Sequence, residues 1–137
     1  MLGDHLVFPI LLSKDLAASR AFYHDMLGLE ILREDDERIM FRCGAGSMVS
    51  VTLSTVGTAD PQTQLGWRVT DLRAELEDLR ARGARIEEYD LPDPKTVNGI
   101  ADMGFAWAAW IIDPSGNALG IIQPKAPGEG GPTPPVR

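Results

Sequence analysis

The chain has few of the residues on which disulfide, thiolate or membrane-spanning proteins depend. Cys43 is the only cysteine among 137 residues, which excludes an internal disulfide and a zinc site built from several cysteines. We expect Cys43 to be a small buried hydrophobe, because nothing nearby in the sequence would lower the pKa of its thiol. No apolar run approaches the roughly 18 to 20 residues of a membrane span, and no secretory signal pattern is present. We therefore expect a cytoplasmic protein.

Positive charge is also scarce. Thirteen Lys and Arg residues face twenty Asp and Glu residues, so the formal net charge is −7. The basic residues are scattered among acidic ones and form no stripe, which argues against nucleic acid as a partner. The length suits one ordinary hydrophobic core.

The last residues differ in composition from the rest. Eight of the fourteen residues in 124–137 are Pro or Gly, a composition that predicts a disordered tail. Residues 1–123 then form a single domain, and this domain contains a repeat. Asp15 and Gly28 of the first copy recur as Asp71 and Gly83 of the second. The repeat predicts two modules, at about 5–54 and 64–123.

Each copy predicts one strand, one helix and three further strands. Asp15 and Asp71 are suited to cap the first turn of a helix, and Gly28 and Gly83 stand where each helix should end. The predicted strands are 6–12, 29–33, 38–43 and 48–53 in the first module, and 65–69, 85–89, 105–112 and 118–123 in the second. We predict loops at 54–63 and 92–103, and the second is either a lid or an ordinary connection. The fold class is therefore α+β, with two βαβββ modules.

Two motifs in this repeat resemble a known family, the vicinal oxygen chelate superfamily of glyoxalases, bleomycin-resistance proteins and extradiol dioxygenases. The match spans about residues 5–123 and rests on Asp15 with Leu16, Ser19, Phe22 with Tyr23, Leu27 with Gly28, the stretch 67–71, and the Asp-Pro-Ser-Gly-Asn turn at 113–117. The resemblance implies curled mixed sheets around a concave pocket with the helices on the convex side. It also implies a homodimer.

Family members usually hold a divalent metal with four His, Gln or Glu ligands. Aligned on the family pattern, the corresponding positions here are Phe8, Ser50 or Thr52, Gln64 and Gly120. Only Gln64 offers a plausible donor, so we expect no metal and no other cofactor. His5 and His24, the two histidines, are expected to be solvated surface residues.

Strand alternation selects the residues that would line the pocket. We predict a mostly apolar site for a small molecule, in which Gln64 and Arg68 are polar groups. Arg68 would need an anionic group of the ligand, or else a carboxylate of the protein itself. Trp107 and Trp110 should point to opposite faces, and we place Trp110 in the pocket. The predicted ligand-binding residues are Phe8, Ile10, Leu12, Gln64, Arg68, Trp110, Gly120 and Ile122.

The resemblance leaves three functions open. The first is a protein that binds or sequesters a small organic molecule without metal, as in the bleomycin-resistance branch. The second is a metal-free enzyme that uses Glu87, Glu88, Tyr89 or Asp102. The third is a glyoxalase, lyase or dioxygenase type of enzyme with a metal site that the sequence does not reveal.

Overall fold

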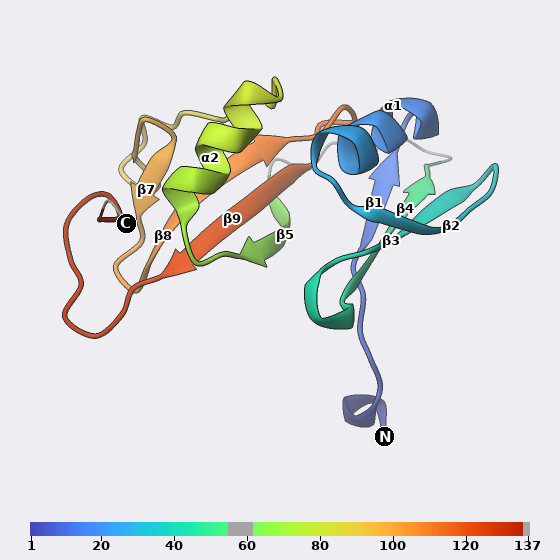
Figure 1. The fold of residues 1–137 in the computed structure, drawn as a ribbon, viewed down its shortest axis with the longest axis horizontal. Coiled ribbons are helices and arrows are strands. Elements are labelled where there is room, and N and C mark those ends of the chain that lie inside the picture. The colour runs from blue at the N-terminus through green and yellow to red at the C-terminus, as the bar shows by residue number, and fades with distance from the viewer. Residues whose placement is uncertain (55–61, 136–137) are drawn as a thin grey trace. The chain divides into compact units, whose positions relative to one another are not determined.

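The computed structural model describes residues 1–54 and 62–135 and confirms the repeat and the α+β class (Figure 1). The chain divides into two compact units. The first comprises Met1–Asp60 and Asp113–Asn117, and the second comprises Pro61–Ile112 and Ala118–Arg137.

The first unit contains a four-stranded mixed sheet and one helical stretch. Its elements are a 3-10 turn Leu2–Asp4, β1 Ile10–Ser13, α1 Leu16–Arg20, a π-helical segment Ala21–Met26, β2 Glu30–Glu34, β3 Arg38–Arg42, a 3-10 turn Gly44–Gly46 and β4 Met48–Leu53. The strand order is β1-β4-β3-β2, in which β1 runs parallel to β4 and the other pairs are antiparallel.

The second unit repeats this plan with one extra hairpin strand. Its elements are β5 Thr63–Arg68, α2 Leu72–Ala81, β6 Thr96–Val97, β7 Ile100–Asp102, β8 Ala106–Ile112 and β9 Ala118–Pro124. The strand order is β5-β9-β8-β7-β6, and β5 runs parallel to β9. The parallel pair at one edge and the antiparallel meander at the other correspond to the first sheet.

Both helices begin where the sequence predicts. The Asp15 carboxylate accepts a hydrogen bond from the Ala18 backbone N–H at 3.2 Å, and Asp71 accepts one from Ala74 at 3.1 Å. These are N-caps, and they satisfy donors that have no partner inside the helix. Gly83 follows α2 at φ +86°, a left-handed conformation that glycine adopts without steric cost.

The first helical stretch buries Ser19, Phe22 and Tyr23, whose spacing places them on one face, while Arg20 is exposed and donates to Glu34. The Tyr23 ring lies 5.6 Å from the Phe41 ring and 4.9 Å from the Phe22 ring, centroid to centroid. This aromatic group closes the core of the first unit against β3.

The core of the second unit lies between α2 and its sheet. Leu72, Leu76 and Leu79 form the buried stripe of α2. The sheet residues beneath it are Trp107, Ala109, Ile111, Leu119 and Ile121. The backbone N–H of Leu72 also donates to the buried amide oxygen of Gln123 at 2.9 Å, which ties the start of the helix to β9.

Three predicted segments differ from the structure. The first strand starts at Ile10 instead of residue 6. Its pairing with β4 begins with Ile10 opposite Ser50, whose N–H bonds the carbonyl of Pro9, and Pro9 itself has no N–H with which to continue the ladder. Residues 85–89 form one isolated bridge, Ile86 to Ile111, and no full strand. Within the loop predicted at 92–103, β6 and β7 form a hairpin whose turn has left-handed φ at Asn98 and Gly99. Most of the other predicted loop, residues 55–61, lies outside the described residues.

The Pro- and Gly-rich segment after β9 makes hydrogen bonds up to Pro134. The Trp107 indole N–H donates to the Gly131 carbonyl at 3.0 Å. The Arg73 guanidinium donates to the Pro134 carbonyl at 2.7 Å and to the Thr133 hydroxyl at 3.0 Å. These donors come from α2 and β8, so the composition of the segment itself does not reveal them.

Candidate functional site

Each sheet has one face against its helix and one face without a helix, which we call the open face. In the first sheet Leu11 and Ser13 lie on the helix side, where the Ser13 hydroxyl is 2.7 Å from the Ser19 hydroxyl of α1. Ile10 and Leu12 therefore lie on the open face, as strand alternation predicts. Ile10 is 60% exposed, which is unusual for a β-branched apolar side chain within a strand.

The open face of the second sheet carries an aromatic side chain next to two glycines. Trp110 of β8 is in register with Gly120 of β9, which is in register with Gly66 of β5. A Cβ at Gly120 would lie 3.3 Å from the Thr63 methyl carbon, and one at Gly66 would lie 3.3 Å from Ile122 Cδ1. We call Trp110, Gly120 and Gly66 the aromatic shelf.

Two neighbours hold the Trp110 indole in place. Its Nε1 donates to the Thr63 hydroxyl at 3.0 Å, so the ring reaches across β9 to β5. Glycine at position 120 leaves room for that reach. The Tyr89 ring packs edge-on against the indole, with centroids 5.4 Å apart and an interplanar angle of 89°. Trp107, three residues earlier, points to the helix side and is fully buried.

The predicted polar residues of this face are arranged differently from the expectation. A register shift between Thr63 and Leu65 puts Thr63 on the open face, and the exposed Gln64 lies at the bulge with its amide donating to the Gln62 carbonyl. Arg68 is exposed and in register with Ile122. Among residues 1–54 and 62–135, no carboxylate forms an ion pair with Arg68.

The residues at the family's metal positions do not fit a divalent cation. Phe8 precedes β1 and is 42% exposed, and Gly120 has no side chain. The Ser50 hydroxyl lies 3.3 Å from the Thr52 hydroxyl, so these two weak donors interact with each other. Within the described part of the chain, no group of three or more His, Cys, Asp or Glu side chains is placed to hold a metal.

The acidic residues considered as catalytic groups all have local partners. On the open face Glu87 is ion-paired with Arg85 at 2.5 Å, beside Tyr89. Glu88 accepts a hydrogen bond from the Gly99 backbone N–H on the helix side. Asp102 pairs with Lys125 at 2.6 Å, and this hydrogen bond, with a second from the Gly104 N–H, lowers the pKa of Asp102 below its usual value.

A buried polar network in the first unit involves both sequence motifs. The Tyr23 hydroxyl donates to Asp113 Oδ2 at 2.7 Å, and the Asn117 side-chain amide donates to the same oxygen at 2.8 Å. The N–H groups of Ser115 and Asn117 donate to Asp113 Oδ1. Burial, with the nearby Asp113 carboxylate, raises the pKa of Tyr23 far above its usual value. The network ties the first helical stretch to the 113–117 turn within the first unit.

The two histidines and the cysteine have ordinary surroundings. His24 is half-buried rather than solvated, and its Nδ1 lies 2.7 Å from the Leu29 carbonyl oxygen, so it helps to close the helix end. His5 is exposed, and Cys43 is half-buried rather than buried. The described residues contain no helix long and apolar enough to cross a membrane.

Comparison with solved structures finds the same fold in several proteins. A glyoxalase/bleomycin resistance protein/dioxygenase from Alicyclobacillus acidocaldarius is 20% identical, with a TM-score of 0.66 over 90% of this chain and 94% of that one. A bleomycin-binding protein complexed with bleomycin is 23% identical, with a TM-score of 0.63 over 88% of this chain and 99% of that one. TnmS3, an antibiotic binding protein from Streptomyces sp. CB03234, is 20% identical, with a TM-score of 0.66 over 88% and 96% of the two chains.

The comparison with curated proteins returns no match. The comparison with protein families matches residues 4–121, which include both modules and both motifs. The chain therefore belongs to the Glyoxalase/Bleomycin resistance protein/Dioxygenase superfamily.

Proposed function

We propose that this protein binds a small, planar organic molecule on the open face of its second sheet and sequesters it without a metal. The observation that carries the proposal is the aromatic shelf. The Trp110 side chain is held by Thr63 and Tyr89 and presents a fixed ring surface. Gly66, on the strand beyond Gly120, has no side chain that would obstruct a ligand there. Flat aromatic ligands gain both apolar burial and offset stacking on such a surface.

The chemistry of the surrounding side chains supports binding over metal-dependent turnover. The family's metal positions offer a phenyl ring, two hydroxyl groups that face each other, a displaced amide and a glycine. Such donors do not offset the loss of hydration of a divalent cation. Arg68, which has no carboxylate partner in residues 1–54 or 62–135, is available on the same face for an acidic or carbonyl group of the ligand.

The comparisons agree with this proposal at the level of the fold. One similar structure is a bleomycin-binding protein with bleomycin, and another is an antibiotic binding protein. In those two proteins a fold of this class serves in binding bleomycin and an antibiotic. We infer the same class of activity here from the shelf and not from sequence identity.

A metal-free enzyme is the second candidate, and one observation favours it. Tyr89 packs against the Trp110 indole, and the Glu87 backbone N–H donates to the Trp110 carbonyl, so a phenol and a carboxylate come from a segment beside the proposed ligand surface. Burial raises the pKa of Tyr89, and the negative charge of Glu87 adds to this shift. The phenol therefore stays protonated at neutral pH and would act as a hydrogen-bond donor or acid.

A ligand screen with planar aromatic compounds, including antibiotics, separates the two candidates. The screen combines thermal shift with Trp fluorescence, and each hit is then incubated with the protein and analysed by mass spectrometry. Binding that leaves the ligand chemically unchanged supports sequestration, and formation of more moles of product than of protein supports the enzyme. A tightly bound stoichiometric metal in the purified protein would overturn both metal-free functions.

Two variants locate the binding surface. Trp110→Leu removes the ring and Gly120→Ala adds a methyl group 3.3 Å from the Thr63 methyl carbon, and each should weaken binding about tenfold. Gly3→Ala is the matched control, because nothing lies within 4 Å of a Cβ at that position. Equal affinities for the wild type, Trp110→Leu and Gly3→Ala would show that the shelf is not the binding site.

We further propose that the protein forms a homodimer. The N-terminal segment exposes Leu2, Leu6 and Val7 by 80% or more, and Ile10 of β1 by 60%, an apolar strip that a second copy would cover. Light scattering after gel filtration should give twice the mass of 14.9 kDa. Leu6→Asp should shift the protein to a monomer, whereas Val97→Asp, at another exposed apolar residue, should not.

A further inference from the structure

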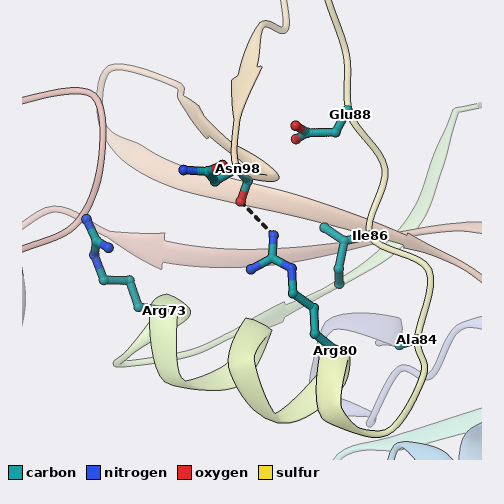
Figure 2. Close-up of a pocket in the computed structure, with 6 residues that line it drawn as sticks. All are labelled: Arg73, Arg80, Ala84, Ile86, Glu88 and Asn98. Carbon is teal, nitrogen blue, oxygen red and sulfur yellow. Dashed lines mark hydrogen bonds between the residues drawn. The ribbon is translucent and has the colours of Figure 1, made fainter.

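The helix side of the second unit contains a cleft that is separate from the aromatic shelf (Figure 2). Its volume is about 590 Å³. The walls are the exposed side of α2, the segment that follows it and the β6–β7 hairpin. The lining residues are Arg73, Arg80, Ala84, Ile86, Glu88 and Asn98.

Two arginines of α2 supply the polar side of this cleft. Arg73 and Arg80 are seven residues apart, nearly two helical turns, so both side chains leave the same side of α2, as Figure 2 shows. The Arg80 guanidinium donates to the Asn98 carbonyl at 2.8 Å. That of Arg73 donates to the Pro134 carbonyl and the Thr133 hydroxyl. Neutral acceptors therefore hold both guanidinium groups in position.

Within the described part of the chain, neither positive charge has an acidic partner. Among residues 1–54 and 62–135, no carboxylate lies within ion-pair distance of Arg73 or Arg80. Most other basic side chains in those residues are ion-paired, namely Arg20, Arg38, Arg42, Arg82, Arg85, Lys95 and Lys125. In a chain of net charge −7, it is notable that one cleft is lined by two guanidinium groups without an ion-pair partner in residues 1–54 and 62–135.

The carboxylate among the lining residues, that of Glu88, is hydrogen-bonded to the backbone and does not pair with either arginine. Glu88 comes from the wall opposite α2 in Figure 2, and its carboxylate accepts the backbone N–H of Gly99. This bond fixes the turn of the β6–β7 hairpin, which also presents the Asn98 carbonyl to Arg80. A Cβ at Gly99 would lie 3.0 Å from Arg80 Nη2 and 2.6 Å from Ile86 Cγ2, so glycine keeps this end of the cleft open.

We propose that this cleft binds a small organic anion with two or more carboxylate or phosphate groups. A guanidinium group has five N–H donors, and these contacts use two on Arg73 and one on Arg80. The remaining donors suit the oxygens of carboxylates and phosphates, and two groups along one helix suit an anion with more than one acidic group. Ala84 and Ile86 offer an apolar wall for its carbon skeleton.

Calorimetric titration of the full-length protein with citrate and with pyrophosphate tests this site. We expect at least one of the two to bind, with an affinity that falls as NaCl is raised because the attraction is between charges. Binding of citrate alone would assign the site to carboxylates, and binding of pyrophosphate alone to phosphates. Binding of neither would overturn the proposal.

Three variants test the location. Arg73→Gln and Arg80→Gln should each weaken binding at least tenfold, whereas Arg82→Gln should not, because Arg82 pairs with Asp78 outside the cleft. Ala84→Leu keeps both guanidinium groups but fills the apolar wall, and it should weaken binding while the far-UV spectrum is unchanged. Equal losses in the Arg80 and Arg82 variants, or no loss with Ala84→Leu, would contradict the proposal. None of these results depends on the aromatic shelf, which lies on the other face of the sheet.

Discussion

Replacing Tyr23 by Phe should destabilise the protein by about 2 kcal/mol, since a buried carboxylate loses one of its donors. The Tyr23 hydroxyl is 2.7 Å from Asp113 Oδ2, and both residues are buried. Hydrogen bonds to charged groups contribute roughly 1.5–3 kcal/mol. The Phe ring keeps the packing against Phe22 and Phe41, so the change removes the hydrogen bond and little else.

Equilibrium unfolding in urea, followed by circular dichroism, measures this loss as a lower midpoint at unchanged slope. Tyr89→Phe is the matched control, because Tyr89 is only half-buried and packs through its ring. Its free energy of unfolding should stay within about 0.5 kcal/mol of the wild type. A Tyr23→Phe loss no larger than that of Tyr89→Phe would refute the assignment of Tyr23 as a necessary donor to Asp113.

The other predictions concern protonation and the helix ends. The pKa of Tyr23 is raised in the folded state, so the unfolded chain loses this proton first as pH rises. The free energy of unfolding should therefore fall above about pH 10, by about 1.4 kcal/mol per pH unit. Urea titrations at pH 9 to 11 should show a shallower fall for Tyr23→Phe than for the wild type. Lys125→Met should raise the pKa of Asp102 toward its usual value, as followed by NMR, and an unchanged pKa would show that the Gly104 N–H accounts for the shift. Asp71→Ala should cost about 1 kcal/mol in the same urea assay, against no change for an exposed mid-helix Glu77→Ala.

Local signals in the sequence predicted most of the fold. Asp15 and Asp71 cap their helices as expected, and β4 has the predicted bounds. These features depend on neighbouring residues, which short windows reveal. The β6–β7 hairpin was predicted as part of a loop, although Asn98-Gly99 is the pair that tight hairpin turns favour. Strands of two and three residues are too short to show alternation, so the turn is the only signal in the sequence.

Features that depend on distant residues were not predictable. The bond between Tyr23 and Asp113 joins residues 90 positions apart, and each looks ordinary in its own segment. The bulge that puts Thr63 in place of Gln64 on the open face depends on the register with β9. Strand alternation placed Trp110 and Trp107 on opposite faces, but the partners that hold the indole, Thr63 and Tyr89, come from other parts of the chain.

The turn Asp113–Asn117 belongs to the first unit although the strands on either side of it belong to the second. Besides binding the Tyr23 hydroxyl, the turn makes two hydrogen bonds to β1 and the residue after it. The Ser115 hydroxyl accepts one from the Lys14 backbone N–H, and the Asn117 side-chain amide donates one to the Leu12 carbonyl. The two halves of this duplicated chain are thus no longer separable parts. A fragment that stops at residue 60 would expose a row of unmet polar groups, and a synthetic peptide spanning the turn should rescue it, as in fragment complementation.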